Sequence, residues 1–400
     1  MPNLRHVTLP AGFLAAGVHC GIKTSRQEDL AVIVAAQPVS AAVLTTSNQV
    51  VGAPVLWCRR VLPAGCGRIR GMVINSGCSN VCTGRGGLRD AEAMAAQVAK
   101  AVGAEKDEVL VASTGVIGHR LPMAKVRRGI AAAVRSLGRS SDPSVLRAIM
   151  TTDTREKSAV VQTRIGGQRV TVAGIIKGAG MIAPSLATMI AVITTDAGIA
   201  PRPLYRAFKA AVAGSLNAVT IDSDESTSDT AVAMASGRAG RRIASGSPAA
   251  RKFAAALAEV CQELAMAMAS DGEGATKLIV IHVTGAASAA DAEIAAKAAA
   301  NSPLLKCAVH GGDPNWGRVL AAVGKSPARV DAEKISVGIG GVAVFSRGRP
   351  RKFDLRAVKK HLSGGAVAID VNLGLGRGEF TAYTCDLSRE YVAINAEYHT

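Results

Sequence analysis

The sequence contains few aromatic residues. Two Trp, four Tyr and six Phe make up 3% of its 400 residues, whereas apolar residues account for 48%. Its cores must therefore be built from Ala, Val, Ile and Leu, as is common in compact α/β proteins. Proteins that bind single strands stack bases on aromatic rings between basic groups, and this chain offers few such rings. We therefore expect no nucleic-acid partner. The net charge of +17 leaves a basic RNA-binding protein as a rival hypothesis.

Long hydrophobic runs are also missing. The most apolar internal stretch, 181–195, is interrupted by Pro184 and Thr188 and is shorter than the roughly 20 residues that a spanning helix needs. A weak resemblance to a signal sequence at 9–18 is spoiled by Pro10 and two glycines. We expect a soluble, cytoplasmic protein with no membrane partner.

Metal and cofactor signatures are lacking. The eight cysteines have irregular spacings and no His pair joins them at zinc-site distances, so we expect reduced, buried thiols and no metal. The phosphate-loop pattern ending at Gly324 fails because Val319 stands where a glycine is needed. No cofactor is therefore expected. The seven histidines are isolated from one another, and His310 is expected to be a loop residue rather than a catalytic base.

What the sequence does contain is a regular alternation of short β-branched runs and Ala-rich helical runs. This pattern predicts a mixed α/β fold. Strands are predicted at 30–36, 41–46, 70–75, 108–112, 170–176, 189–194 and 278–283, and helices at 88–102, 123–137, 203–217, 248–269 and 290–300. Asp142 followed by Pro143 predicts a helix start with the carboxylate as cap.

The length favours two domains. A boundary near 285–292 predicts a catalytic α/β core at 1–285 and a smaller α/β domain at 286–400. This boundary is predicted only from the turn-forming composition of the segment.

The segment 177–197, KGAGMIAPSLATMIAVITTDA, leads from a glycine-rich turn through Ala187 and Thr188 into an apolar strand. A small residue before a threonine at a strand start suits self-cleavage, in which the Thr188 hydroxyl attacks the Ala187 carbonyl. The new terminal α-amine titrates near neutral pH and lies beside the hydroxyl, so it can act as its base. From strand propensity alone, a purely structural threonine is the more common case.

Three other segments combine polar side chains with tight turns. In VLVASTGVIG (109–118), the backbone amides around Thr114 and Gly115 can converge on a developing oxyanion, although a plain strand-to-loop turn gives the same pattern. The other two segments are DGEGATK (271–277) and the terminal NAEYHT (395–400). Each is also compatible with a solvated turn or tail.

Several ordered segments carry a wider resemblance. They are NSGCSNVCTG (75–84), STGVIG (113–118), MTTDT (150–154), KGAGMIAPSLATM (177–189), STSDTAV (226–232), DGEGATK (271–277), DPNWGRVLAAVG (313–324) and NAEYHT (395–400). Together they resemble the ornithine acetyltransferase family of arginine biosynthesis, whose bifunctional members are also N-acetylglutamate synthases. The resemblance covers nearly the whole chain. Cys78, Ser79, Ser223 and Ser228 depart from the family pattern and bear mainly on substrate preference.

The resemblance implies the layered sheet-and-helix core of self-processing acetyltransferases and aminopeptidases, with a C-terminal tail that returns to the active site. It implies cleavage between Ala187 and Thr188 into an α chain (1–187) and a β chain (188–400), which associate as two α and two β chains. Thr188 would be the nucleophile, and Thr114 and Gly115 the oxyanion hole. The implied substrate-binding residues are Thr151, Lys177, Thr188, Glu273, Asn395 and Thr400.

The implied reaction moves an acetyl group from N2-acetylornithine to glutamate through an acetyl-threonine ester. Acetyl-CoA is a further possible acetyl donor, as a substrate rather than a cofactor. The nearest alternative is a self-processed aminopeptidase or amidase of related fold, which would deliver the acyl group to water.

Overall fold

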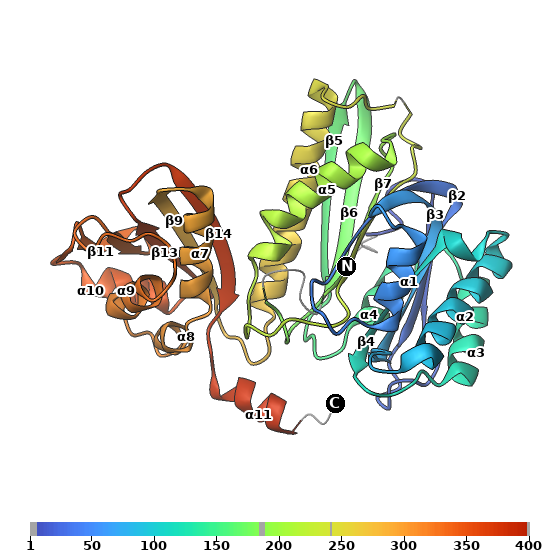
Figure 1. Ribbon diagram of the computed structural model, residues 1–400, viewed down its shortest axis with the longest axis horizontal. Coiled ribbons are helices and arrows are strands. Elements are labelled where there is room, and N and C mark those ends of the chain that lie inside the picture. The colour runs from blue at the N-terminus through green and yellow to red at the C-terminus, as the bar shows by residue number, and fades with distance from the viewer. Residues whose placement is uncertain (1–5, 184–188, 241, 398–400) are drawn as a thin grey trace.

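The computed structural model describes residues 6–183, 189–240 and 242–397. Within them the chain forms two sheets, each covered by helices (Figure 1). The larger sheet has the order β4-β3-β2-β8-β7-β6-β5, with β1 paired to β2. Its strands are β1 (Phe13–Val18), β2 (Leu30–Thr45), β3 (Cys66–Cys78), β4 (Val109–Val116), β5 (Lys157–Ile165), β6 (Gln168–Lys177), β7 (Ile190–Thr195) and β8 (Thr230–Ala235).

The larger sheet is folded onto itself at β2. The pairing register of β2 with β3 shifts between Val34 and Val39, so that β2 contributes to two halves of the sheet. Ile33 of the first half shares one core with Val192 and Val232 of the second half, which shows that the two halves pack face to face. The two expected strands at 30–36 and 41–46 are therefore one long strand that changes layer at an irregularity.

Helices cover the outer faces of both halves (Figure 1). They are α1 (Ala53–Val61), α2 (Gly84–Val102), α3 (Met123–Arg135), α5 (Pro201–Ala213) and α6 (Pro248–Ser270). A further helix, α4 (Asp142–Ile149), packs its buried side chains into the core between the two halves. Val32 and Val34 pack with α2 and α3, whereas Ile193 and Ala191 pack with α5 and α6. Because side chains alternate between the faces of a strand, the result is a helix–sheet–sheet–helix arrangement. The predicted mixed α/β fold of sheet and helix layers is confirmed.

Helix α6 is long and apolar enough by composition to cross a membrane, and half of that window is buried. Phe253, Leu257, Val260 and Leu264 lie in the core against β5 and β6. Their spacing of three and four residues is that of one buried face, as the sequence predicted. The helix is thus a core element of the protein.

The smaller sheet has the order β12-β11-β10-β13-β9-β14. Its strands are β9 (Leu278–Ala286), β10 (Ser336–Ile339), β11 (Val342–Ser346), β12 (Arg349–Pro350), β13 (Ala366–Asn372) and β14 (Gly378–Cys385). Its helices are α7 (Ala289–Ala300), α8 (Pro303–His310), α9 (Trp316–Gly324) and α10 (Leu355–Leu362), and α11 (Arg389–Glu397) follows β14. The smaller sheet begins at Leu278, so a division at 285/286 leaves β9 on the wrong side of the boundary.

Three expectations for single residues are wrong. Helix α4 begins at Asp142 as predicted, but the carboxylate of Asp142 accepts hydrogen bonds from Thr8 instead of capping the helix. His310 ends α8, and its Nδ1 lies 2.7 Å from the carboxylate of Asp386, so it is no loop residue. Cys82 and Cys307 are exposed, although all eight cysteines are free.

Candidate functional site

One pocket gathers six of the residues that the sequence singled out. Its volume is about 180 Å³. Thr114, Gly115, Thr151, Lys177, Glu273 and Asn395 all line it, although they come from five separate parts of the chain. Ala187, Thr188 and Thr400 lie outside the described residues.

Lys177 is the central cation of this pocket. It ends β6, is 2% exposed, and donates a hydrogen bond from Nζ to Oγ1 of Thr114 over 3.3 Å. Burial lowers the pKa of Lys177, while the nearby carboxylate of Asp153 opposes that shift. The ends of β4 and β6 therefore meet at a buried ammonium that has donor capacity left for a ligand.

Asp153 organises the backbone around Lys177. Its Oδ1 accepts the amide of Gly178 over 2.7 Å, and its Oδ2 accepts the amide of Thr151 over 2.9 Å. Lys157 bridges Asp153 and Asp271, both of which are buried. Burial by itself would raise the pKa of Asp153, but the ammonium groups of Lys177 and Lys157 hold it at about 2. Asp153 is therefore ionised at neutral pH, and its hydrogen bonds fix the loops that carry Thr151 and Lys177.

Gly115 allows two strands to approach closely beside the pocket. Its φ is +125°, and a Cβ built on it would lie 2.4 Å from the carbonyl carbon of Gly77. Gly77 and Gly115 are register partners in the parallel pair of β3 and β4. Only glycine fits this position without strain. The Thr114–Gly115 turn is thus fixed by the backbone itself.

Glu273 supplies the negative charge of the pocket. Its amide donates to the carbonyl of Ala179 over 2.8 Å, and its Oε2 accepts a hydrogen bond from Nδ2 of Asn395 over 2.9 Å. A Cβ on Gly180 would lie 2.4 Å from that same Oε2, so the glycine makes room for the carboxylate. Asn395 belongs to α11, which lies apart from the smaller sheet, below the larger part of the molecule (Figure 1).

The remaining lining residues were not predicted as site residues. They are Ser79, Ile117, Thr152, Gly180, Met181, Ser226, Thr227 and Ser228. Most fall inside the segments of the resemblance, such as STSDTAV, which was the available signal. Ser79 and Ser228, two departures from the family pattern, thus lie where they can contact a ligand.

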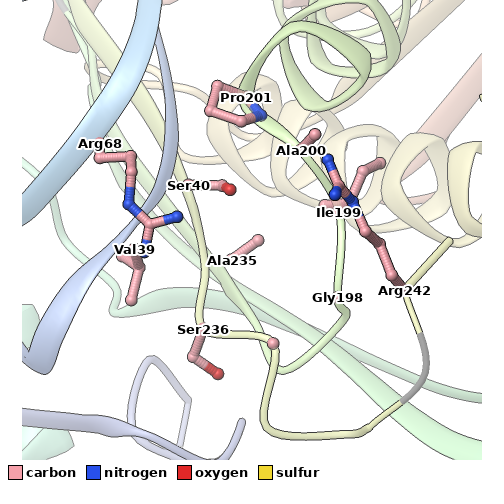
Figure 2. A pocket seen from close by; sticks show the side chains of 11 residues that line it. Val39, Ser40, Arg68, Gly198, Ile199, Ala200, Pro201, Ala235, Ser236 and Arg242 are labelled. Carbon is pink, nitrogen blue, oxygen red and sulfur yellow. The ribbon is translucent and has the colours of Figure 1, made fainter.

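A second pocket, of about 330 Å³, lies at the other end of β7 and β8. Figure 2 shows Arg68 and Arg242 on opposite sides of it, with the hydroxyl of Ser40 between them. The residues that line it include no carboxylate and no lysine. It lacks the pairing of opposite charges found around Lys177, and we do not take it as the active site.

The layered fold and the pocket around Lys177 and Glu273 define an enzyme that acts on a small polar molecule. A sequence model of the ArgJ family matches residues 14–400. The chain belongs to the ArgJ family, whose curated members are proteins of arginine biosynthesis.

Individual relatives agree with this assignment. "Arginine biosynthesis bifunctional protein ArgJ" of Geobacillus kaustophilus is 42% identical over 395 residues, 98% of this chain and 96% of that protein. Its namesake in Symbiobacterium thermophilum is 44% identical over 397 residues, 98% of each chain. The crystal structure of the ArgJ protein of Bacillus halodurans is similar with a TM-score of 0.50 and 40% identity, over 51% of this chain and 97% of that chain.

Proposed function

We propose that this enzyme moves an acetyl group from N2-acetylornithine to glutamate, using Thr188 as nucleophile after self-cleavage between Ala187 and Thr188. The observation that carries the proposal is the charge arrangement of the pocket. A buried ammonium at Lys177 and a carboxylate at Glu273 face one small cavity, which suits a ligand that has both a carboxylate and an ammonium. Amino acids such as ornithine and glutamate have both groups.

The position of the pocket supports Thr188 as nucleophile. Ile190 at the start of β7 is the register partner of Lys177, so β7 begins beside a residue that lines the pocket. In the first half-reaction the Thr188 hydroxyl attacks the acetyl carbonyl, its proton passes to the α-amine, and ornithine leaves as an amine. In the second half-reaction the amine of glutamate attacks the ester and restores the hydroxyl. Amides of the Thr114–Gly115 turn would stabilise the oxyanion in both steps.

The lengths of the relatives support self-cleavage. Curated relatives match this chain over nearly its full length. The solved chain from Bacillus halodurans is shorter, because 97% of it matches only 51% of this chain. Cleavage near the middle of such a full-length chain would produce a piece of about that size. The proposed products here are residues 1–187 and 188–400, associated as two α and two β chains in the cytoplasm.

We further propose acetyl-CoA as an additional acetyl donor and no bound cofactor. The names of the curated relatives include the word bifunctional, which supports a second donor. Thr151 and Thr400 complete the proposed substrate contacts, together with Asn395.

Intact mass and an acetyl-transfer assay test the proposal. We expect wild-type protein to appear as two fragments that transfer acetyl from N2-acetylornithine to glutamate, and Thr188→Ala to remain whole and inactive. A Thr188→Ala variant that keeps full activity would refute the mechanism. Release of free ornithine without glutamate, at the rate seen with it, would instead support the amidase alternative.

A further inference from the structure

Two carboxylates, the half-buried Asp222 and the buried Asp229, hold the backbone on either side of the proposed cleavage segment. Before it, Asp222 accepts the amides of Met181 and Ile182 over 2.6 and 2.8 Å. After it, Oδ1 of Asp229 accepts the amide of Met189 over 2.8 Å. Met189 directly follows Thr188 in the chain. Asp229 is thus within hydrogen-bond distance of the backbone one residue after the proposed nucleophile.

Asp229 is fixed in place by its own surroundings. It precedes β8, is 0% exposed, and its carbonyl accepts the amide of Thr46 over 3.2 Å. The Thr46 hydroxyl in turn donates to the carbonyl of Ser226 over 2.6 Å. A carboxylate held so rigidly has little freedom to adjust, which suits a residue that sets the position of a neighbour.

One oxygen of Asp229 has no assigned role. Within the part of the chain that the structure describes, Oδ2 is buried without a hydrogen-bond partner. Leaving a buried carboxylate oxygen unpaired is costly, and such groups call for an explanation. Burial raises the pKa of Asp229 well above its ordinary value, against the opposing effects of the Met189 amide and the Lys177 ammonium.

We infer that Asp229 is a positioning residue for self-cleavage, with Oδ1 fixing the Met189 amide next to the proposed nucleophile. The inference rests on the proposed function. Because a peptide unit is planar, holding the amide of Met189 also fixes the direction of the bond to residue 188. Reacting atoms must approach to within about 3–3.5 Å, so a misplaced hydroxyl is ineffective.

The chemical step leaves Asp229 unchanged. The Thr188 hydroxyl oxygen forms an ester bond with the Ala187 carbonyl carbon, and the Ala187–Thr188 C–N bond breaks. The hydroxyl proton goes to the departing nitrogen. Water then hydrolyses the ester, which gives the Ala187 carboxylate and the free Thr188 hydroxyl. Asp229 orients the chain and is neither consumed nor altered in charge.

The test compares Asp229→Asn and Asp229→Ala with Asp196→Asn. Asparagine keeps an oxygen for the Met189 amide and places an NH₂ group at the other position, whereas alanine removes both. Asp196 is the matched control, since it is 8% exposed, accepts the Thr171 amide over 2.8 Å and lies at the other end of β7. The rate of cleavage is followed by intact mass after purification of uncut precursor, and folding by thermal unfolding.

We expect Asp229→Ala to slow cleavage on the order of 100-fold, because a displaced nucleophile loses its near-attack geometry. Asp229→Asn should cleave at a rate within about threefold of wild type. Such a rescue would not occur if cleavage required a charge at this position. Asp196→Asn should cleave as wild type. Cleavage of Asp229→Ala at the wild-type rate, or equal loss in Asp229→Asn and Asp229→Ala, would overturn the inference. Wild-type protein that never cleaves would instead refute the proposed function.

Discussion

Asn395 and Glu273 lie 122 residues apart in sequence and are joined by a hydrogen bond of 2.9 Å at the pocket. The bond connects α11, which follows the smaller sheet, to a loop that precedes it. None of the described residues of α11 is buried, so the helix depends on a few polar contacts of this kind. The tail is therefore both a part of the site and its least anchored element.

Asn395→Ala should weaken substrate binding without affecting self-cleavage. Glu273 would lose a donor that orients its carboxylate, and we expect KM for N2-acetylornithine to rise about tenfold, which corresponds to roughly 1.4 kcal/mol. Steady-state kinetics measure this change. Val392→Ala is the control on the same helix, since its side chain is 64% exposed, and it should leave KM unaltered.

Gly180→Ala should displace the carboxylate of Glu273. The added methyl group would lie 2.4 Å from Oε2, so the side chain must rotate away from the pocket. We expect kcat/KM to fall at least about tenfold while the melting temperature changes little, because a flexible side chain can move. Gly214→Ala is the matched control, since a Cβ there meets no atom within 4 Å. Loss of activity in both variants would contradict this explanation.

Gly115→Ala should reduce stability as well as activity. Alanine at a φ of +125° is strained, and its Cβ would lie 2.4 Å from the backbone of Gly77. Since neither strand can move freely, we expect the free energy of unfolding to fall by about 2–3 kcal/mol in denaturant titrations. Gly365→Ala, where a Cβ finds open space, should change it by less than about 1 kcal/mol.

The charge of Asp153 should make the stability of the protein depend on pH in acid. Its pKa is about 2 in the folded protein against an ordinary value of 3.8. A carboxylate with a lowered pKa stabilises the folded protein at pH values above the pKa that it has in the unfolded chain. This contribution of about 2 kcal/mol is lost as pH falls from about 4 to about 2. Denaturant titrations across this range should show the loss in wild type and not in Asp153→Asn.

At neutral pH, Asp153→Asn should itself destabilise the protein by about 3–5 kcal/mol, because Lys177 and Lys157 would lose a buried counterion. Asp331→Asn is the control, since it breaks only an exposed pair with Lys334 and should leave the stability nearly unchanged. An Asp153→Asn protein as stable as wild type at pH 7 would show that the buried network is not needed for folding.

Local patterns predicted the regular elements well. Helix α6 lies close to its predicted range because its buried side chains recur at helical spacing. Strand β6 does so because it is a short, continuously buried run rich in Val, Ile and Thr. The bend of β2 was missed because strand propensity is low around Pro38, although β3 pairs with β2 on both sides of the bend and β8 pairs with it after the bend. Several short strands, such as β10 and β11, offer too few residues for a periodic pattern.

The site was predictable mainly through the resemblance. Lys177 and Glu273 are separated by 96 positions, and no local spacing indicates that they share a pocket. The carboxylates of Asp153, Asp222 and Asp229 were not singled out, because their partners are backbone amides of distant or irregular segments. The capping role expected for Asp142 failed for a related reason, since a contact with Thr8 across the fold replaced a local one.

The order of strands in the larger sheet decides what a cut before Met189 does to the molecule. Strands β7 and β8 are inserted between β2 and β6, which both belong to the earlier part of the chain. Pulling the two pieces apart would break the ladders of β8 with β2 and of β7 with β6 and expose the middle of two cores. The nicked protein should therefore elute as one interlocked particle without denaturant, and the larger sheet should not form from either piece produced without the other.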